Sequence, residues 1–218
     1  MTGDLFLALD VEQAAPVKMA DGAWMLPRYA YKDAAQLLEE IERVASLAPF
    51  RHMVTPGGFS MSVGMTNCGS FGWVTDRRGY RYQNTDPASG DIWPAMPESF
   101  LRLAVSAALK AGYPDFAPNA CLINRYEPGA KMSLHQDKDE KDFTKPIVSV
   151  SLGLPATFQF GGSNRGDPVR KFPLSHGDVV VWGGPSRLFY HGIMPLKDGT
   201  YDGVGRTRYN LTFRHAAL

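Results

Sequence analysis

Two His-x-Asp triplets stand out in this sequence, because an imidazole and a carboxylate at this spacing could bind one metal ion. On an extended segment alternate side chains share a face, so the first and third residues of such a triplet point the same way. With a further histidine they would form a face of two histidines and one carboxylate. That face leaves coordination positions open for a co-substrate and for oxygen. The triplets are His135-Gln136-Asp137 and His176-Gly177-Asp178.

The two triplets compete for His191, which lies in a later extended run. Asp178 opens a predicted strand that would pair with the His191 strand through the turn at 183–186, and this pairing would bring the two residues close. Against it, Gly177 favours a tight turn, and Asp178 is typical of turn chemistry. We therefore favour His135, Asp137 and His191 as the metal ligands. A set that uses His176 or Asp178 stays the alternative.

The run 206–214 provides a second candidate site. Alternation along a strand places polar side chains on one face and hydrophobic or aromatic ones on the other. Two inward arginines would cost much free energy unless an anion met them. A small dicarboxylate would do so, since a guanidinium binds a carboxylate through two hydrogen bonds. The alternative is a solvated edge strand. The polar face consists of Arg208, Asn210, Thr212 and Arg214.

Residues 51–94 combine many glycines with aromatic rings and mostly basic charges. Glycines allow mobile hairpins, aromatic rings stack on bases, and arginines meet phosphates. The mixture predicts a nucleotide-binding lid, and the alternative is a hairpin layer whose aromatic residues belong to the core. The aromatic residues are Phe59, Phe71, Trp73, Tyr80, Tyr82 and Trp93.

Helices and strands must position these residues. Asp33 as N-cap, Gln36 three residues later and Pro49 predict one helix, after one or two strands around 23–26. Pro97 at the first helical position and Gly112 as the stop predict a helix over 97–111. Short runs between Pro or Gly turns then predict a sandwich or barrel, so the fold class is mainly β with flanking helices (α+β). The strands are expected at 120–127, 131–137, 146–153, 156–161, 177–182, 187–194 and 206–214.

The composition fits one domain. The chain has 218 residues, 44% of them hydrophobic, which is enough for one large core. Residues 1–50 carry a net charge of −4, so residues 51–218 carry +5. A modestly basic body suits a polyanion without requiring one. We expect a single domain over 1–218, with the lid at 51–94 and a β-rich core at 120–214.

Cys68 and Cys121 lack any metal-binding spacing, which favours reduced thiols. The apolar run 5–9 is flanked by acids and is too short for a signal peptide or a membrane span. We therefore expect a soluble, cytoplasmic protein without a membrane partner, and a monomer.

Taken together, these motifs resemble the AlkB family of Fe(II)/2-oxoglutarate-dependent dioxygenases, and in particular its bacterial members. The likeness extends from about residue 24 to residue 214. It implies a double-stranded β-helix (jelly roll) with an N-terminal nucleotide-recognition lid, and Fe(II), 2-oxoglutarate and O2 as cofactor and co-substrates. The motifs that carry it are Asn124-Arg125-Tyr126, His135-Gln136-Asp137-Lys138-Asp139, His191 and Arg208-Tyr209-Asn210-Leu211-Thr212-Phe213-Arg214.

The resemblance also implies roles for single residues. His135, Asp137 and His191 correspond to the iron ligands. Arg208 corresponds to the partner of the distal 2-oxoglutarate carboxylate and Arg214 to a neighbour of the iron-bound end. The polar neighbours of this co-substrate correspond to Asn124, Tyr126 and Asn210. The substrate contacts correspond to Trp73 against the flipped base, the backbone strip Tyr80, Arg81 and Tyr82, Asp139 near the damaged base, and Arg165.

The implied reaction is oxidative demethylation of N-alkylated bases, such as 1-methyladenine and 3-methylcytosine, with release of formaldehyde, succinate and CO2. The implied partner is alkylated single-stranded or double-stranded DNA, with RNA as a further candidate, and the role is direct-reversal DNA repair. The alternatives are a 2-oxoglutarate oxygenase acting on RNA, a protein or a small molecule, and a non-catalytic binding module. Two departures bear on strand preference: Phe59 stands where Tyr is expected, and Asp76 where a neutral or basic residue is.

Overall fold

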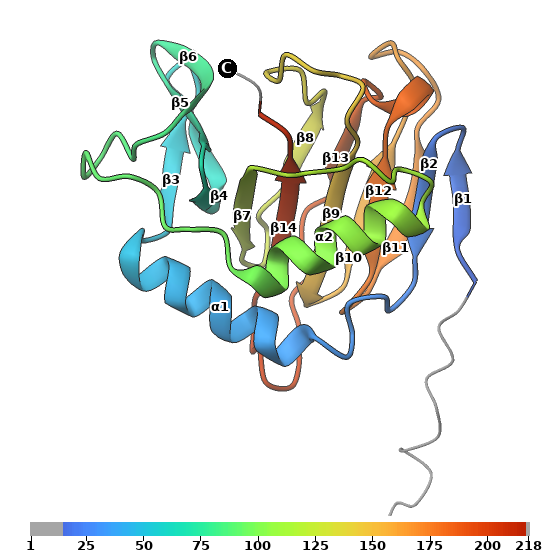
Figure 1. Cartoon of the computed structure of the whole chain (residues 1–218), viewed down its shortest axis with the longest axis horizontal. Helices are drawn as coiled ribbons and strands as arrows, with labels where there is room; N and C mark the ends of the chain where they lie inside the picture. The colour runs from blue at the N-terminus through green and yellow to red at the C-terminus, as the bar shows by residue number, and fades with distance from the viewer. Residues whose placement is uncertain (1–14, 217–218) are drawn as a thin grey trace, which may run out of the picture.

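The computed structural model of the chain describes residues 15–216, so the expectation about the apolar run 5–9 lies outside the described residues. The described residues form two α-helices and three antiparallel sheets (Figure 1). None of the described helices is long and apolar enough to cross a membrane.

The sheets differ in size and in the residues that they bring together. The major sheet has the strand order β1 (Val17–Ala20), β2 (Ala23–Leu26), β12 (Val179–Trp182), β9 (Ile147–Gly153), β14 (Arg208–Arg214), β7 (Ala120–Tyr126), β4 (Ser60–Gly69) and β3 (Arg51–Val54). The minor sheet has the order β11 (Arg170–Leu174), β10 (Ala156–Phe160), β13 (His191–Ile193) and β8 (Met132–His135). A separate hairpin consists of β5 (Gly72–Asp76) and β6 (Gly79–Gln83).

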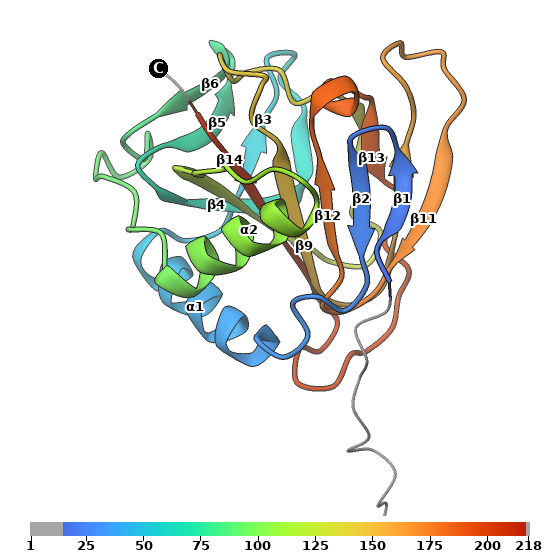
Figure 2. The same ribbon diagram turned by 45° about the vertical axis from the view of Figure 1, so that its right-hand side comes forward.

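Two hydrophobic cores divide the molecule into layers. The helices α1 (Ala34–Leu47) and α2 (Glu98–Lys110) cover one face of the major sheet, as Figures 1 and 2 show from two sides. Leu37, Phe100 and Phe213 lie in this first core. The second core lies between the major and minor sheets and contains Phe158 and Trp182. The result is a β-sandwich with helices on one side, which confirms the predicted mainly-β jelly roll with helical support.

The helix ends differ slightly from the sequence expectation. Asp33 is the N-cap of α1, but its side chain makes no capping hydrogen bond, so the predicted capping box is absent. Pro97 is the N-cap of α2 and not its first helical residue. Gly112 follows the C-cap of α2 with a φ of +92°, a conformation that glycine adopts without strain.

One predicted strand pairing is wrong. The β12 strand pairs with β2 and β9, whereas β13 pairs with β8 and β10, so Asp178 and His191 do not belong to one hairpin. The short 3-10 turn Gly184–Ser186 leads the chain from the major sheet into the minor one. The strand β11 was not predicted, because exposed charged residues and Pro173 interrupt its pattern at the edge of the sheet.

The predicted lid segment 51–94 is divided by the fold. Its first two strands, β3 and β4, belong to the major sheet, and β4 pairs with β7 over Gly64–Gly69. Val63 and Met65 on β4 are fully buried, so this part of the segment contributes to the core, whereas Phe59 in the turn before β4 is exposed. Cys68 and Cys121 are buried free thiols that lie opposite each other on β4 and β7. The β5–β6 hairpin forms a sheet of its own, and hydrogen bonds between Trp73 and Asn67 and from Thr75 to Val54 join it to β4 and β3.

The glycine that ends β9 provides a test of this packing. Gly153 has a φ of +84°, and a Cβ there would lie 2.3 Å from the carbonyl oxygen of Thr207. Gly129 has a φ of +89° with nothing within 4 Å of such a Cβ. We expect Gly153→Ala to lower the free energy of unfolding by about 3 kcal/mol and Gly129→Ala by about 1 kcal/mol, since only the first adds overpacking to backbone strain. Urea unfolding measures both, and equal losses would contradict the tight contact.

Candidate metal and co-substrate site

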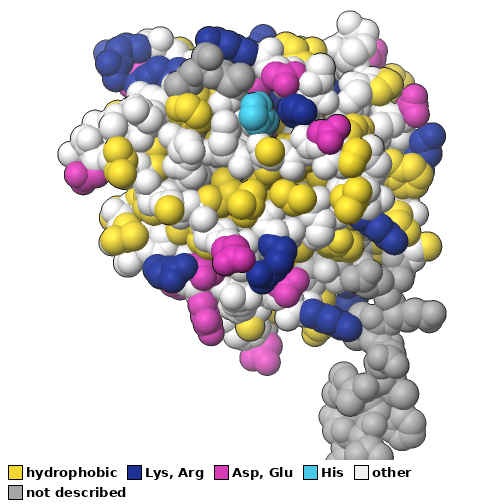
Figure 3. Space-filling model, in the orientation of Figure 1, with side chains coloured by type: hydrophobic (Ala, Val, Ile, Leu, Met, Phe, Trp, Pro, Cys, Tyr) yellow, Lys and Arg dark blue, Asp and Glu magenta, His cyan; other side chains and the backbone are white. Residues whose placement is uncertain are grey.

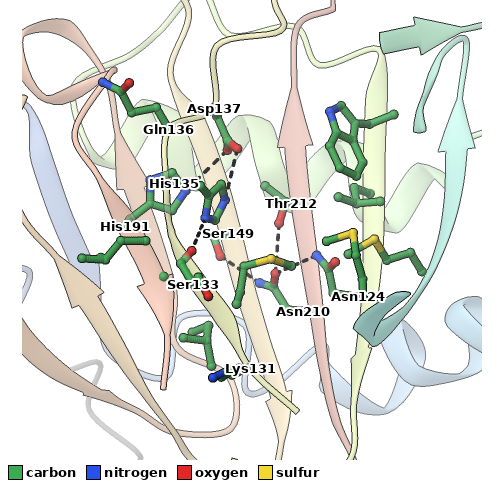
Figure 4. A pocket seen from close by; sticks show the side chains of 18 of the residues that line it. Asn124, Lys131, Ser133, His135, Gln136, Asp137, Ser149, His191, Asn210 and Thr212 are labelled. Carbon is green, nitrogen blue, oxygen red and sulfur yellow. Dashed lines mark hydrogen bonds and ion pairs between the residues drawn. The ribbon is translucent and has the colours of Figure 1, made fainter. Parts of the chain in front are cut away.

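Two histidines and one aspartate meet where β8 and β13 pair. His135 ends β8, His191 begins β13, and the two are register partners. Asp137 lies two residues beyond β8. The ligand atoms of the three residues all lie within 4.8 Å of one another, so one ion could contact all three. In Figure 4 these side chains point toward one another.

Hydrogen bonds orient both imidazole rings. His135 Nδ1 lies 2.9 Å from the carbonyl oxygen of Ser133, and His191 Nδ1 lies 2.9 Å from that of Phe189. A carbonyl oxygen only accepts, so each Nδ1 carries the hydrogen and each Nε2 keeps its lone pair for a metal. The Nε2 atoms lie 3.5 and 3.7 Å from the two carboxylate oxygens of Asp137.

The charges around Asp137 keep its carboxylate ionised. Burial alone would raise the pKa of Asp137, but the Arg214 guanidinium, with Nη2 2.7 Å from Oδ2, holds that pKa well below its usual range. Burial, reinforced by the neighbouring His135, lowers the pKa of His191, which favours the neutral ring. Burial also opposes charge on His135, yet the Asp137 carboxylate raises its pKa. A carboxylate with neutral imidazoles is the donor set that Fe(II) takes in facial triads.

Arg208 is a buried cation with unused donors. Its side chain is 1% exposed, and its Nε and one terminal nitrogen have no hydrogen-bond partner among the described residues. The other terminal nitrogen donates to Ser151 Oγ at 3.0 Å, and the guanidinium lies 4.9 Å from the ring centre of Tyr126. Burial lowers the pKa of Arg208. Unpaired donors on a buried cation favour an anionic partner, so a carboxylate group fits here.

A polar row connects Arg208 with the metal-ligand candidates. Asn124 donates to Asn210, which donates to Ser149 in turn, and Thr212 donates to Asn210 as well (Figure 4). The row lines one cavity of about 630 Å³ together with His135, Asp137, His191, Tyr126, Arg208 and Arg214. The central position of β14, between β9 and β7, shows that the solvated-edge alternative was wrong.

Four of the predicted substrate contacts lie at the same cavity. Trp73, Tyr80, Asp139 and Arg165 all line it. The rings of Trp73 and Tyr80 stack at 5.7 Å, and Trp73 Nε1 donates to Asp139 at 2.7 Å. The guanidinium of Arg165 lies 5.0 Å from the ring centre of Tyr190. Flat rings, a carboxylate and a guanidinium thus surround the cavity beside the metal-ligand candidates.

The predicted backbone strip is not one surface. Arg81 pairs with Asp76 at 2.9 Å, and Tyr82 turns inward and donates to Glu140, so Tyr80 alone keeps an exposed ring. Asp76 binds both Arg78 and Arg81, which lowers the pKa of its carboxyl group. The unexpected acid therefore orients two arginines.

His176 and Asp178 accept hydrogen bonds from backbone amides around their own turn. His176 Nδ1 accepts a hydrogen bond from the Gly153 amide, and the ring stacks on Tyr201 at 4.5 Å. Asp178 accepts the backbone amides of Arg28 and Ser175 at 2.8 and 2.7 Å. Within residues 15–216, one group of potential metal ligands lies close enough to share an ion, and it contains neither residue.

Some residues around the site were missed. Ser149 and Ser151 line up with the polar row, and their signal was two serines at alternate positions between valines of a buried strand. Glu140 and Arg187 lie beneath Asp137, where they are almost fully buried. No local pattern identified them, because their partners are distant in the sequence.

Comparison with known proteins finds one matching family, similar sequences and a similar fold. The model of the 2OG-Fe(II) oxygenase superfamily matches residues 22–214. The chain is 63% identical to the alpha-ketoglutarate-dependent dioxygenase AlkB of Escherichia coli (strain K12), covering 91% of this chain and 92% of that protein. The protein of the same name from Salmonella typhimurium (strain LT2) is 61% identical over the same shares. A solved structure of OsALKBH1 superposes with a TM-score of 0.82 at 28% identity, over 92% of this chain and 100% of that one.

Metal binding distinguishes the two sets of histidines. We expect His191→Ala to raise the dissociation constant for Co(II) at least 100-fold. Removing an outer-shell partner of a metal ligand raises it by up to about 100-fold, and His191→Ala removes a direct ligand. The matched control His176→Ala should bind Co(II) like the wild type. Isothermal titration calorimetry measures both, and a comparable loss in His176→Ala would contradict the assignment.

Proposed function

The chain belongs to the 2OG-Fe(II) oxygenase superfamily and, within it, to the AlkB family of alpha-ketoglutarate-dependent dioxygenases, and we propose that it demethylates N-alkylated bases in nucleic acids. It is thus an enzyme that uses Fe(II), 2-oxoglutarate and O2. The observation that carries the proposed substrate is the cavity, which joins the metal-ligand candidates to the stacked rings of Trp73 and Tyr80.

His135, Asp137 and His191 would hold the iron. Their Nε2 atoms and carboxylate oxygens lie within 4.8 Å of one another, and the carboxylate stays ionised because Arg214 pairs with it. Bound Fe(II), together with 2-oxoglutarate and O2, supplies the oxidation that turns an N-methyl group into a hydroxymethyl group, with formaldehyde, succinate and CO2 as the final products. The protein residues position what reacts.

Arg208 and Arg214 orient 2-oxoglutarate in this proposal. Arg208 binds the distal carboxylate with donors that no described residue uses, and a flat guanidinium suits a carboxylate partner. Arg214 lies beside Asp137 and therefore near the end that meets the iron. Asn124, Tyr126 and Asn210 line the space between, where polar side chains fix the orientation of the co-substrate.

A flipped base would enter beside Trp73. The methyl group must reach the iron, so the base must leave the stack, and a lesion that already weakens pairing lowers the cost of flipping. Trp73 and His135 line the same cavity, and Asp139 places a negative charge near a cationic methylated base. Lys and Arg side chains gather over the β5–β6 hairpin, where Arg77 and Arg78 are exposed to meet phosphates (Figure 3).

Damaged DNA is the partner that this surface fits, as a single strand or a duplex, with RNA as a further candidate. A single strand needs no unpairing before its base can flip, so it costs the enzyme the least free energy. We propose that the protein works as a monomer in the cytoplasm. The two buried free thiols suit that reducing compartment.

The proposed reaction is tested on a short single-stranded oligonucleotide that carries 1-methyladenine. With Fe(II), ascorbate and 2-oxoglutarate, we expect wild type and His176→Ala to remove one methylene unit of mass, and His135→Ala to leave the oligonucleotide unchanged. Mass spectrometry measures the change. Turnover of 2-oxoglutarate without any change in the oligonucleotide would sink the proposed substrate, and the oxygenase assignment would remain.

Binding of 2-oxoglutarate is tested at Arg208. We expect Arg208→Met to raise the KM for 2-oxoglutarate about 100-fold, because hydrogen bonds to a charged group are worth about 3 kcal/mol. Met fills a buried site without leaving a charge. The control is Arg206→Met, whose arginine pairs with Asp198 on the surface. Steady-state kinetics with varied 2-oxoglutarate measures both, and an unchanged KM in Arg208→Met would contradict this role.

A further inference from the structure

A connected group of buried polar side chains lies beneath the metal-ligand candidates. Glu140 is at its centre, in the loop that follows β8, with its side chain 2% exposed. It does not line the cavity, and neither do Arg187 and Tyr82. The five members of the group are Tyr82, Asp137, Glu140, Arg187 and Arg214.

Two guanidinium groups hold the Glu140 carboxylate. Arg187 Nη2 lies 2.9 Å from Oε2, and Arg214 Nε lies 3.4 Å from Oε1. A carboxylate in such a buried place is tolerated only with close charged partners and hydrogen bonds. With Asp137, the group contains two acids and two arginines, so its charges balance. No step of the proposed reaction uses Glu140 directly.

Glu140 reaches Asp137 by two routes. Arg214 Nε lies between Glu140 Oε1 and Asp137 Oδ2, 3.1 Å from the latter, so Glu140 fixes the plane of the guanidinium that contacts the ligand. Arg187 donates from one terminal nitrogen to Glu140 and from the other to the backbone carbonyl of Asp137 at 2.7 Å. One carboxylate thus constrains both the side chain and the backbone of Asp137, leaving Oδ1 toward His135.

The same carboxylate is connected to the β5–β6 hairpin. Tyr82 donates its hydroxyl hydrogen to Glu140 Oε1, the oxygen that Arg214 Nε also approaches. Tyr82 is the register partner of Trp73, which stacks on Tyr80 at the substrate side of the cavity. A movement of the hairpin away from the body would remove one hydrogen bond from Glu140 and change how Arg214 is held.

We propose that Glu140 is a positioning residue for the metal ligand Asp137, acting through Arg214 and Arg187, and that Tyr82 connects the base-contacting hairpin to it. The inference rests on the proposed function in one respect, since it takes Asp137 as an iron ligand. Outer-shell partners of metal ligands change metal affinity about 10–100-fold when they are removed. Arg214 contacts the ligand Asp137 directly, and Glu140 in turn holds Arg214.

The first test uses Glu140→Gln, which keeps the shape and removes the charge. We expect the dissociation constant for Co(II) to rise about tenfold and the visible absorption spectrum of bound Co(II) to change, because Asp137 is held less firmly. The demethylation kcat should fall while the KM for the oligonucleotide stays the same. The matched control is Glu42→Gln, since Glu42 accepts a comparable tyrosine hydroxyl, from Tyr209, on the exposed opposite side.

The second test uses Tyr82→Phe, which removes one hydroxyl group and keeps every charge, so it should fold even if Glu140→Gln does not. We expect about a threefold weaker Co(II) affinity and a spectral change in the same direction, a smaller effect than loss of a full outer-shell partner. Tyr209→Phe is its matched control and should match wild type. Far-ultraviolet circular dichroism checks the fold of each variant.

Wild-type Co(II) affinity and spectrum in folded Glu140→Gln would overturn the positioning role. If Glu140→Gln does not fold, unchanged Co(II) affinity and spectrum in Tyr82→Phe would overturn the whole inference. The titration needs no nucleic acid, so it separates two kinds of failure. A wild type that binds Co(II) but does not demethylate contradicts the proposed substrate, whereas unaltered variants contradict the role of Glu140.

Discussion

The buried ion pair between Arg214 and Asp137 is the contact on which the rest of the site depends. Asp137 lies in a loop beyond β8, where no strand pairing holds its backbone. Arg214 belongs to β14, which pairs with β7 and β9 along its length, so its position is set by the major sheet. Neither charge is tolerated in this interior without a close charged partner. Arg214, which the sheet fixes, therefore holds in place a carboxylate that would otherwise be mobile.

The two sheets divide the chemistry between them. The minor sheet brings His135 and His191 together by the register of β8 and β13. The major sheet supplies the anion-binding face, on which Arg208 keeps free donors. Aromatic packing fixes the distance between the layers: Trp182 and Phe158 lie 4.9 and 6.0 Å from the ring of His191. Because both faces of one cavity are built on rigid strands, metal and co-substrate positions are set before either is bound.

The β5–β6 hairpin depends on the loop after β8. A two-stranded sheet is marginally stable by itself, so it needs contacts with the body. Two of its side-chain hydrogen bonds end on acids of that loop: Trp73 donates to Asp139, and Tyr82 donates to Glu140. Asp137 lies in the same loop. The proposed substrate contacts and the proposed metal ligand thus share one short segment of backbone, which would be the physical basis for coupling between them.

Local periodicity in the sequence determined which side chains share a face, because the alternation of a strand depends on neighbouring residues alone. It identified the inward row of β14 and the hydrophobic faces of both helices. It could not determine strand partners, so the pairing expected for Asp178 was wrong and the pairing of β4 with β7 was not predicted. The contacts of Glu140 join residues 58 and 47 positions apart. Only the tertiary structure decides such contacts, since they depend on how the whole chain packs and on which charges are buried together.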